Sequence, residues 1–313
     1  MVSAREFAGR DVITVNEFRR DEILFLLDAA AKFEQVTGTL LAGRVIATLF
    51  FEPSTRTRLS FESAVGRLGG SCVGFAQAGV SSQAKGESLA DTVRVVEGYS
   101  DVLLLRHPLE GAARLAAEVA DIPVVNCGDG AHQHPTQTFV DLYTIQRECN
   151  RLDGLHVVFA GDLRYGRAVH SLVSVLALFN ARITLVSPDF LRLPEEQRES
   201  LGLLGIEYRE TEQLEPSLPE ADVLYMTRVQ RERFTDPAEY DRFKDAYTLD
   251  LRVLERARET LAILHPLPRV QEIAPEVDRH PHAAYFRQAH YGVAVRKALL
   301  ALLLGQAGKV LGE

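Results

Sequence analysis

The sequence predicts an α/β protein with two doubly wound parallel-sheet domains. Short apolar runs rich in β-branched residues alternate along the chain with longer stretches of amphipathic, helical periodicity. This alternation is typical of parallel sheets whose strands are joined by right-handed helical crossovers. The chain has 313 residues, more than the roughly 150 usually assigned to one domain, which favours two domains.

The apolar runs are the predicted strands. Their β-branched and aliphatic residues suit strands that are buried on both faces of a parallel sheet. They span residues 45–51, 71–75, 102–105, 123–127, 156–160, 183–187, 222–226 and 261–264.

Helical patterns lie between these strands. Ser88, with Asp91 three residues later, resembles an N-terminal capping box, and Gly69 and Gly70 end the preceding helix. The stretch 291–304 is apolar on most faces, so it is expected to pack deeply as a C-terminal helix. The other predicted helices span residues 54–68, 88–99, 111–120, 136–149 and 167–179.

Composition and charge exclude several classes of protein. Hydrophobic residues make up 46% and charged residues 25%, which is typical of globular domains and not of disordered chains. The net charge of −8 argues against a protein that binds nucleic acid through phosphate contacts. The longest apolar run, 298–304, is too short for a membrane span. The N-terminal residues lack the apolar region of a secretory signal, so we expect a cytoplasmic location.

Metal and disulfide chemistry are not indicated. The three cysteines, Cys72, Cys127 and Cys149, are widely spaced and form no C-x-x-C pair. We therefore expect no metal and no disulfide framework.

Polar segments follow six of the predicted strands. In open parallel sheets the ligand binds at the carboxyl ends of the strands, so arginine, hydroxyl, amide and imidazole groups converge on one rim. The segments are Glu52–Arg58, Arg106–Pro108, Gly128–Gln137, Gly161–Arg167, Thr227–Gln230 and His265–Arg269.

Each segment on its own has an alternative interpretation. Ser54 to Thr57 can cradle a phosphate at a helix start, or form an ordinary cap beside a surface arginine. The turn Gly161–Arg167 lacks the G-x-G-x-x-G pattern of a dinucleotide loop. His134 fits a structural role as well as a ligand role, and Lys85 lies in a small-residue loop where a solvated lysine is the default.

Together these segments resemble the catalytic chain of the aspartate carbamoyltransferase family. The resemblance spans nearly the whole chain, in order, and seven motifs in register are far more specific than any one of them. The motifs are Phe50–Arg58, Lys85–Glu87, Arg106–Pro108, His134–Thr138, Gly161–Asp162 with Tyr165–Arg167, Tyr225–Gln230 and His265–Arg269.

The second substrate is indicated by motifs outside Ser54–Thr57, which carbamoyltransferases share. The segment His265–Arg269 has a proline where ornithine enzymes typically carry a cysteine. With Arg167, Arg228 and Gln230 it points to aspartate, since arginines bind a dicarboxylate and repel the cationic side chain of ornithine.

The resemblance implies carbamoyl transfer from carbamoyl phosphate to L-aspartate in pyrimidine synthesis, with no cofactor. Ser54, Thr55, Arg56, Thr57 and Arg106 would hold the phosphate. Arg106 and His134 would bind the carbonyl oxygen. The carbamoyl amino group would donate hydrogen bonds to Gln137 and to the carbonyl groups of Pro266 and Leu267. Aspartate would be bound by Lys85, Arg167, Arg228 and Gln230.

The resemblance also implies an assembly and a division of the chain. Ser81 and Lys85 match residues that enter the active site of a neighbouring subunit, which implies a homotrimer with shared sites. Glu52 and Arg233 match residues of domain closure. The carbamoyl phosphate domain would comprise residues 1–134 plus 287–313 and the aspartate domain 150–286, with 135–149 as a linking helix and the active site in the cleft between the domains.

Other readings stay open at this point. The acceptor can be another amino acid, or the chain can be a non-catalytic anion-binding scaffold; a nucleotide-dependent oxidoreductase has only the Gly161 turn in its favour. Family trimers occur alone, with zinc-bearing regulatory chains or with dihydroorotase-type partners, and the sequence does not choose among these.

Overall fold

The computed structural model describes residues 2–77, 86–231, 234, 236–243 and 246–313. The chain divides into two compact units: unit 1 comprises Met1–Tyr143 and Ala289–Glu313, and unit 2 comprises Thr144–Gln288. Each unit contains one sheet, and every strand pair in both sheets is parallel. The predicted α/β fold with two parallel-sheet domains is confirmed.

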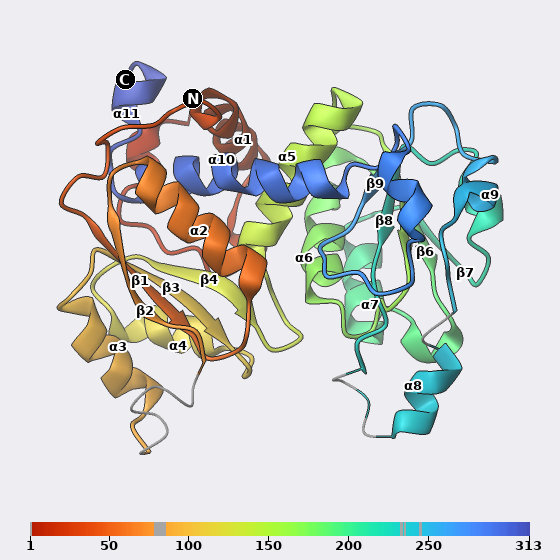
Figure 1. Ribbon diagram of the computed structural model, residues 1–313, viewed down its shortest axis with the longest axis horizontal. Coiled ribbons are helices and arrows are strands. Elements are labelled where there is room, and N and C mark those ends of the chain that lie inside the picture. The colour runs from red at the N-terminus through yellow and green to blue at the C-terminus, as the bar shows by residue number, and fades with distance from the viewer. Residues whose placement is uncertain (1, 78–85, 232–233, 235, 244–245) are drawn as a thin grey trace. The chain divides into compact units, whose positions relative to one another are not determined.

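Unit 1 has a four-stranded sheet in the order β2-β1-β3-β4. In Figure 1, α3 and α4 lie on one face of this sheet and α2 and α10 on the other, as in a doubly wound fold. Its elements are α1 (Arg20–Phe33), β1 (Val45–Phe50), α2 (Thr55–Arg67), β2 (Ser71–Phe75), α3 (Leu89–Glu97), β3 (Val102–His107), α4 (Ala112–Val119), β4 (Val124–Asp129), the start of α5 (Pro135–Cys149), most of α10 (Tyr285–Leu303) and α11 (Gly308–Leu311).

The core of unit 1 follows from the alternation of side chains along its strands. Ala47 and Leu49 of β1 and Leu103 of β3 point to one face, where they pack with Val93 of α3 and Ala113 of α4. The edge strand β2 is different, because most of its residues are exposed or only partly buried. In unit 1, helices therefore cover the central strands, whereas the edge strand β2 stays largely exposed.

Unit 2 has a five-stranded sheet in the order β7-β6-β5-β8-β9. Its core includes Val158, Leu224 and Ile263 from three adjacent strands, packed with Leu254 and Tyr285. Its elements are β5 (His156–Ala160), α6 (Arg167–Leu176), the 3-10 turn η5 (Ala177–Phe179), β6 (Arg182–Val186), α7 (Glu195–Leu203), β7 (Tyr208–Thr211), β8 (Val223–Met226), α8 (Pro237–Phe243), α9 (Leu251–Leu254) and β9 (Ala262–Leu264).

All eight predicted strands are present, with ends within two residues of those expected. One strand, β7, was not predicted. Its sequence Tyr-Arg-Glu-Thr contains no apolar run, and its residues are at most partly buried because it lies at the edge of the sheet. The strand forms by pairing with β6, a tertiary contact that no local pattern announces.

The predicted helices also form, with some changes at their ends. Ser88 is the N-cap of α3, and its side chain accepts a hydrogen bond from the Asp91 N–H at 3.1 Å. The C-terminal helix begins at Tyr285, earlier than the expected residue 291.

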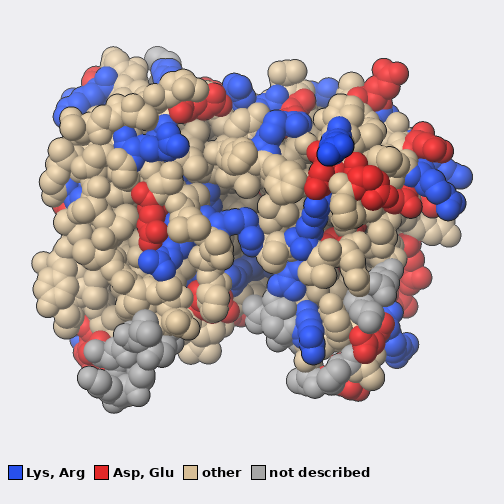
Figure 2. All heavy atoms as spheres, in the orientation of Figure 1, with Lys and Arg blue, Asp and Glu red and all other residues tan. Residues whose placement is uncertain are grey.

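Surface and charge follow the composition. On the face drawn in Figure 2, basic and acidic side chains are mixed and separated by uncharged surface. In the described ranges, no helix is long and apolar enough to cross a membrane. Within the same ranges, no group of three or more His, Cys, Asp or Glu residues is arranged to hold a metal ion. The three cysteines are free thiols.

Candidate active site

Many of the sequence-predicted site residues follow the strands at which each sheet reverses its order. In unit 1 the chain runs outward in opposite directions from the neighbours β1 and β3, and in unit 2 from β5 and β8. Such a switch point leaves a crevice at the carboxyl ends of the strands where ligands bind. Ser54 to Thr57 follow β1, Arg106 lies at the end of β3, Arg167 follows β5, and Arg228 and Gln230 follow β8.

The first turn of α2 presents the Ser54–Thr57 segment. Ser54 is the N-cap in extended conformation, but its side chain makes no capping hydrogen bond. Thr55 and Arg56 are exposed, whereas Thr57 is buried. The free N–H groups of a first helical turn and the positive end of the helix dipole favour an anion here. Of the alternative interpretation, an ordinary cap beside a surface arginine, the exposed arginine is present but the side-chain capping hydrogen bond is not.

Thr57 and His134 meet although 77 residues separate them. The Thr57 Oγ1 lies 3.5 Å from the His134 Nε2, and both side chains are buried. His134 directly precedes α5, and its carbonyl oxygen accepts hydrogen bonds from the N–H groups of Gln137 and Thr138. The starts of two helices, α2 and α5, therefore converge on one point of unit 1.

Arg106 is held at the end of β3. Its guanidinium donates to the Cys127 carbonyl oxygen at 3.2 Å, and its Nε lies 3.4 Å from the Glu52 carboxylate. Its side chain is 14% exposed, so the positive charge is largely removed from water and its field is weakly screened. The pair with Glu52 joins two residues that the sequence assigned to different roles, phosphate binding and domain closure.

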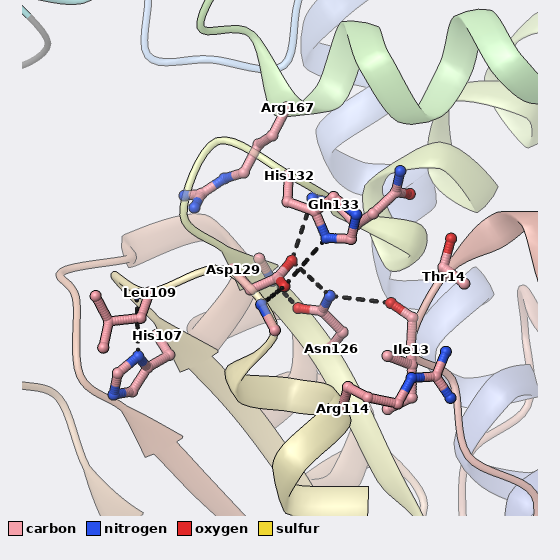
Figure 3. A network of polar contacts seen from close by, with 12 residues as sticks. Ile13, Thr14, His107, Leu109, Arg114, Asn126, Asp129, His132, Gln133 and Arg167 are labelled. Atoms are coloured by element: carbon pink, nitrogen blue, oxygen red, sulfur yellow. Dashed lines mark hydrogen bonds and ion pairs between the residues drawn. The ribbon is translucent and has the colours of Figure 1, made fainter. Parts of the chain in front are cut away.

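Asp129 anchors the loop between β4 and α5 that carries His134 (Figure 3). Its carboxylate accepts hydrogen bonds from the Asn126 side chain at 2.9 Å and from the N–H groups of Gly111 at 2.9 Å and Gln133 at 3.1 Å. It also contacts the His132 Nδ1 at 3.3 Å. Burial acts to raise the pKa of Asp129, but hydrogen bonds from His132, Asn126 and Gly111 lower that pKa below its usual value.

Asn126 ties this loop to the N-terminal segment. Its side-chain amide also donates to the Ile13 carbonyl oxygen at 3.0 Å, and its oxygen accepts from the Gly128 N–H at 2.8 Å. Both Asn126 and Asp129 are buried. Hydrogen bonds thus join the loop before His134 to β4, to the N-terminal segment and to Gly111.

In unit 2, Asp162 joins the two strand ends at the switch point. Its carboxylate accepts from the N–H groups of Tyr165 at 3.0 Å and Gln230 at 3.2 Å. Burial raises the pKa of Asp162 to about 6, although hydrogen bonds from Tyr165, Gln230 and Arg164 and the charge of Arg228 oppose that shift. The residue therefore places the backbone of Gln230 beside the turn that leads to Arg167.

Gly161 is required where the same two strand ends touch. Its φ is +119°, and a Cβ atom here would lie 2.1 Å from the Thr227 carbonyl oxygen. Only glycine allows this close approach. The glycine of the weak dinucleotide-like turn is thus explained by packing against Thr227 rather than by a bound nucleotide.

His265 holds the turn that contains Pro266 and Leu267. The Leu267 N–H donates to the His265 Nδ1 at 2.7 Å, so the proton lies on Nε2, which donates to the Glu272 carboxylate at 2.7 Å. Leu267 has a φ of +55°. The turn that carries the two predicted carbonyl acceptors is therefore fixed by a buried His–Glu pair.

The structure places most of the predicted site residues at the switch points of their own units. Three of them, Ser81, Lys85 and Arg233, lie outside the described residues. Sequence reasoning gave no role to Asp129, Asp162 or Glu272. The sequence did hold a signal for the two aspartates, since each stands at the end of a strand predicted to be buried and close to arginines. A carboxylate buried at such a position is costly unless it accepts hydrogen bonds, so a structural role could have been expected.

The fold and these side chains define a two-unit α/β protein that presents arginine, hydroxyl and imidazole groups to anionic substrates. Residues 10–147 match the family model for the aspartate/ornithine carbamoyltransferase carbamoyl-P binding domain. Residues 153–303 match the model for the Asp/Orn binding domain of the same enzymes. The chain belongs to the aspartate/ornithine carbamoyltransferase family.

Curated relatives agree over nearly the full length. The chain is 57% identical to the aspartate carbamoyltransferase catalytic subunit of Thermococcus onnurineus, over 96% of this chain and 98% of the relative. It is 56% identical to the subunit of the same name from Methanopyrus kandleri, over 96% of this chain and 98% of the relative.

Solved structures agree as well. The catalytic subunit of M. jannaschii aspartate transcarbamoylase superposes with a TM-score of 0.88 at 49% identity, covering 95% of this chain and 98% of that one. Aspartate transcarbamoylase from Trypanosoma cruzi in complex with carbamoyl phosphate and aspartate gives a TM-score of 0.91 at 38% identity, covering 97% and 99%. The resemblance found in the sequence is confirmed.

Proposed function

We propose that the protein transfers the carbamoyl group of carbamoyl phosphate to the α-amino group of L-aspartate, giving N-carbamoyl-L-aspartate and phosphate, in de novo pyrimidine biosynthesis. The observation that carries the proposal is the meeting of Thr57 and His134 at the starts of α2 and α5. This meeting sets a hydroxyl and an imidazole beside the N–H groups of a helix start, which is a site for a phosphate and a developing oxyanion.

In this account carbamoyl phosphate binds to unit 1. Its phosphate takes hydrogen bonds from the backbone and side chains of Ser54, Thr55, Arg56 and Thr57, and from Arg106. The carbonyl oxygen faces Arg106 and His134, whose donors stabilise the negative charge that builds on it. The carbamoyl amino group donates to Gln137 and to the carbonyl oxygens of Pro266 and Leu267.

Aspartate supplies the nucleophile. Its carboxylates bind Arg167, Arg228 and Gln230, together with Lys85 of a neighbouring subunit, and this leaves the α-amino nitrogen to attack the carbamoyl carbon. The new C–N bond forms, the C–O bond to the phosphate breaks, and the departing phosphate takes the amine proton. No cofactor enters this scheme.

The division of labour between the domains is part of the proposal. Residues 1–134 plus 287–313 bind carbamoyl phosphate and residues 150–286 bind aspartate, with 135–149 as linking helix and the active site in the cleft between the two domains. The two family models support the division as far as residue 286, and the grouping of Ala289–Glu313 with unit 1 supports the assignment of the C-terminal segment. Glu52 and Arg233 act in domain closure. Glu52 already has an ion-pair partner, Arg106, which it can give up for another when the domains close.

The active form is a homotrimer with shared sites, in which Ser81 and Lys85 act in the neighbouring subunit. Support comes from the edge of the unit 1 sheet. Strand β2 is an edge strand, and it exposes Val73. Exposed edge strands of this kind favour association.

Mixing subunits tests the shared site. Lys85→Ala and His134→Ala trimers are each expected to be nearly inactive, and to regain partial activity when their subunits are exchanged. Hybrids with no recovery would show that each site is built from one chain. Co-purification from the source cells tests whether regulatory or dihydroorotase-type chains join the trimer. We also propose a cytoplasmic location.

The activity itself is tested by product formation from carbamoyl phosphate with L-aspartate or L-ornithine and the purified chain alone. We expect carbamoyl aspartate and no citrulline. Citrulline would assign another acceptor, and binding of phosphate without either product would favour the scaffold role.

A further inference from the structure

The side chain of Gln137, on the first turn of α5, is held from behind. Its Nε2 donates to the Asp141 Oδ1 at 2.7 Å, one helical turn further along. Asp141 is fully buried, whereas Gln137 is partly exposed. An ionised carboxylate can only accept hydrogen bonds. The amide therefore turns its NH₂ group toward Asp141 and its Oε1 oxygen away from it.

A buried cation favours the ionised form of Asp141. Arg296 of α10 interacts electrostatically with Asp141, is 4% exposed, and lies over the ring of Phe61 at 5.1 Å. Gly292 makes room for its guanidinium, since a Cβ there would lie 2.3 Å from an Arg296 nitrogen. Burial lowers the pKa of Arg296 to about 10, while Cys127 and Asp141 act to raise it, so the group is charged at neutral pH.

We propose that Asp141 is a positioning residue that fixes Gln137 as a hydrogen-bond acceptor and so makes the site select a carbamoyl phosphate over an acyl phosphate. The inference rests on the proposed function, in which Gln137 faces the carbamoyl amino group. Acetyl phosphate carries a methyl group in that place and offers nothing to the Oε1 oxygen. If the amide of Gln137 were free to turn, its NH₂ group would meet the NH₂ group of the substrate, two donors with no acceptor.

Asp141→Asn tests this directly, because an asparagine can both donate and accept and no longer dictates the orientation of Gln137. The affinities of carbamoyl phosphate, acetyl phosphate and inorganic phosphate are measured by calorimetry. We expect carbamoyl phosphate to bind about 5- to 20-fold more weakly, the size of one hydrogen bond. The affinities of the other two ligands should stay within about twofold, because neither has an amino group.

A general disturbance of the site would look different. Equal weakening of all three ligands, or no change in any, overturns the inference. The matched control is Glu148→Gln on the same helix, which turns another carboxylate near an arginine into an amide, since Glu148 binds Arg287 at 2.6 Å. It should bind all three ligands as the wild type does.

A double-mutant cycle separates positioning from a direct effect. If Asp141 acts through Gln137, adding Asp141→Asn to Gln137→Leu should change the preference for carbamoyl over acetyl phosphate little further. Additive losses overturn the inference.

Folding and the proposed function are kept apart. If Asp141→Asn does not fold, Asp141→Asn with Arg296→Met removes both buried, opposite charges together, which is tolerated better than removing one. The same selective loss is expected, and retained selectivity overturns the inference. If the wild type binds none of the three ligands, the proposed function is contradicted. If the wild type prefers carbamoyl phosphate and the variant keeps the same preference, only the role of Asp141 is contradicted.

Discussion

Units 1 and 2 both place a buried aspartate at the carboxyl end of a strand, yet the pKa values of the two carboxyl groups shift in opposite directions. Asp129 of unit 1 is surrounded by donors from Asn126, Gly111, Gln133 and His132, and its pKa is lowered although burial acts to raise it. Burial raises the pKa of Asp162 in unit 2 to about 6, because backbone donors from three residues do not offset it.

The difference shows how the same fold makes one site fixed and the other sensitive to pH. The loop before His134 is held by a carboxylate that stays ionised. The backbone of Gln230 is held by a carboxyl group that gains its proton near pH 6. Carbamoyl phosphate binding in unit 1 should therefore depend less on the protonation of its supporting residues than aspartate binding in unit 2.

The largest expected effect is on the chemistry at unit 1. His134→Ala should lower kcat by roughly 10²- to 10³-fold, the usual cost of one oxyanion donor, while carbamoyl phosphate still binds. Steady-state kinetics and calorimetry on the same preparation check both parts. Activity within a few-fold of the wild type would remove His134 from the mechanism.

The next effect tests the anchor of the fixed loop. Asp129→Ala leaves the Asn126 amide and the N–H groups of Gly111 and Gln133 without their buried acceptor, so the free energy of unfolding in urea should fall by about 3–5 kcal/mol. Asp129→Asn, which keeps one acceptor oxygen, should lose clearly less. Equal losses in the two variants would show that the ionised carboxylate is required, and that neither the volume nor the single acceptor oxygen that asparagine keeps contributes.

A smaller and pH-dependent effect is expected at Asp162. Its folded-state pKa of about 6 lies above the ordinary value of 3.8, so its contribution to stability is fully present below pH 3.8 and is lost as the pH rises through about 6. Relative to Asp162→Asn, the wild type should therefore lose about 2 kcal/mol of unfolding free energy between pH 4 and pH 7. Urea denaturation at both pH values measures this, and a difference independent of pH would mean that Asp162 is ionised as readily as in water.

The smallest effect is expected for an exposed ion pair, which serves as a reference for the changes in stability and activity predicted above. Arg94 and Asp91 form an ion pair at 3.7 Å on the surface of α3, with more than half of each side chain exposed. Because exposed pairs of this kind contribute little, Arg94→Ala should leave both stability and activity unchanged within error. A clear loss of activity would point to a contact of α3 in the assembly.

Much of the fold could be predicted because eight strands are apolar runs, and seven of them, all but β2, are largely buried, as strands of a parallel sheet with such runs usually are. Strand β7 could not, since Tyr208–Thr211 is an edge strand whose pairing with β6 is a tertiary contact. The order of the strands was also beyond local patterns, although it is what brings Ser54–Thr57 and Arg106 to one switch point.

The candidate site was predicted from side chains that would face the ligand, and less well from those behind them. His134 and Arg106 stood out by their place after strands. Asp141 and Glu272 did not, since a carboxylate within a helix or loop is usually solvated, and only the structure shows that both are buried against Gln137 and His265.

The central claim is that unit 1 binds the phosphate group and unit 2 binds aspartate, the acceptor of the carbamoyl group. Calorimetric titration with inorganic phosphate and with N-(phosphonacetyl)-L-aspartate tests it, using Arg56→Ala in unit 1 and Arg228→Ala in unit 2. We predict that Arg56→Ala weakens binding of both ligands, whereas Arg228→Ala weakens only N-(phosphonacetyl)-L-aspartate. Loss of phosphate binding in Arg228→Ala as large as that in Arg56→Ala would contradict the account.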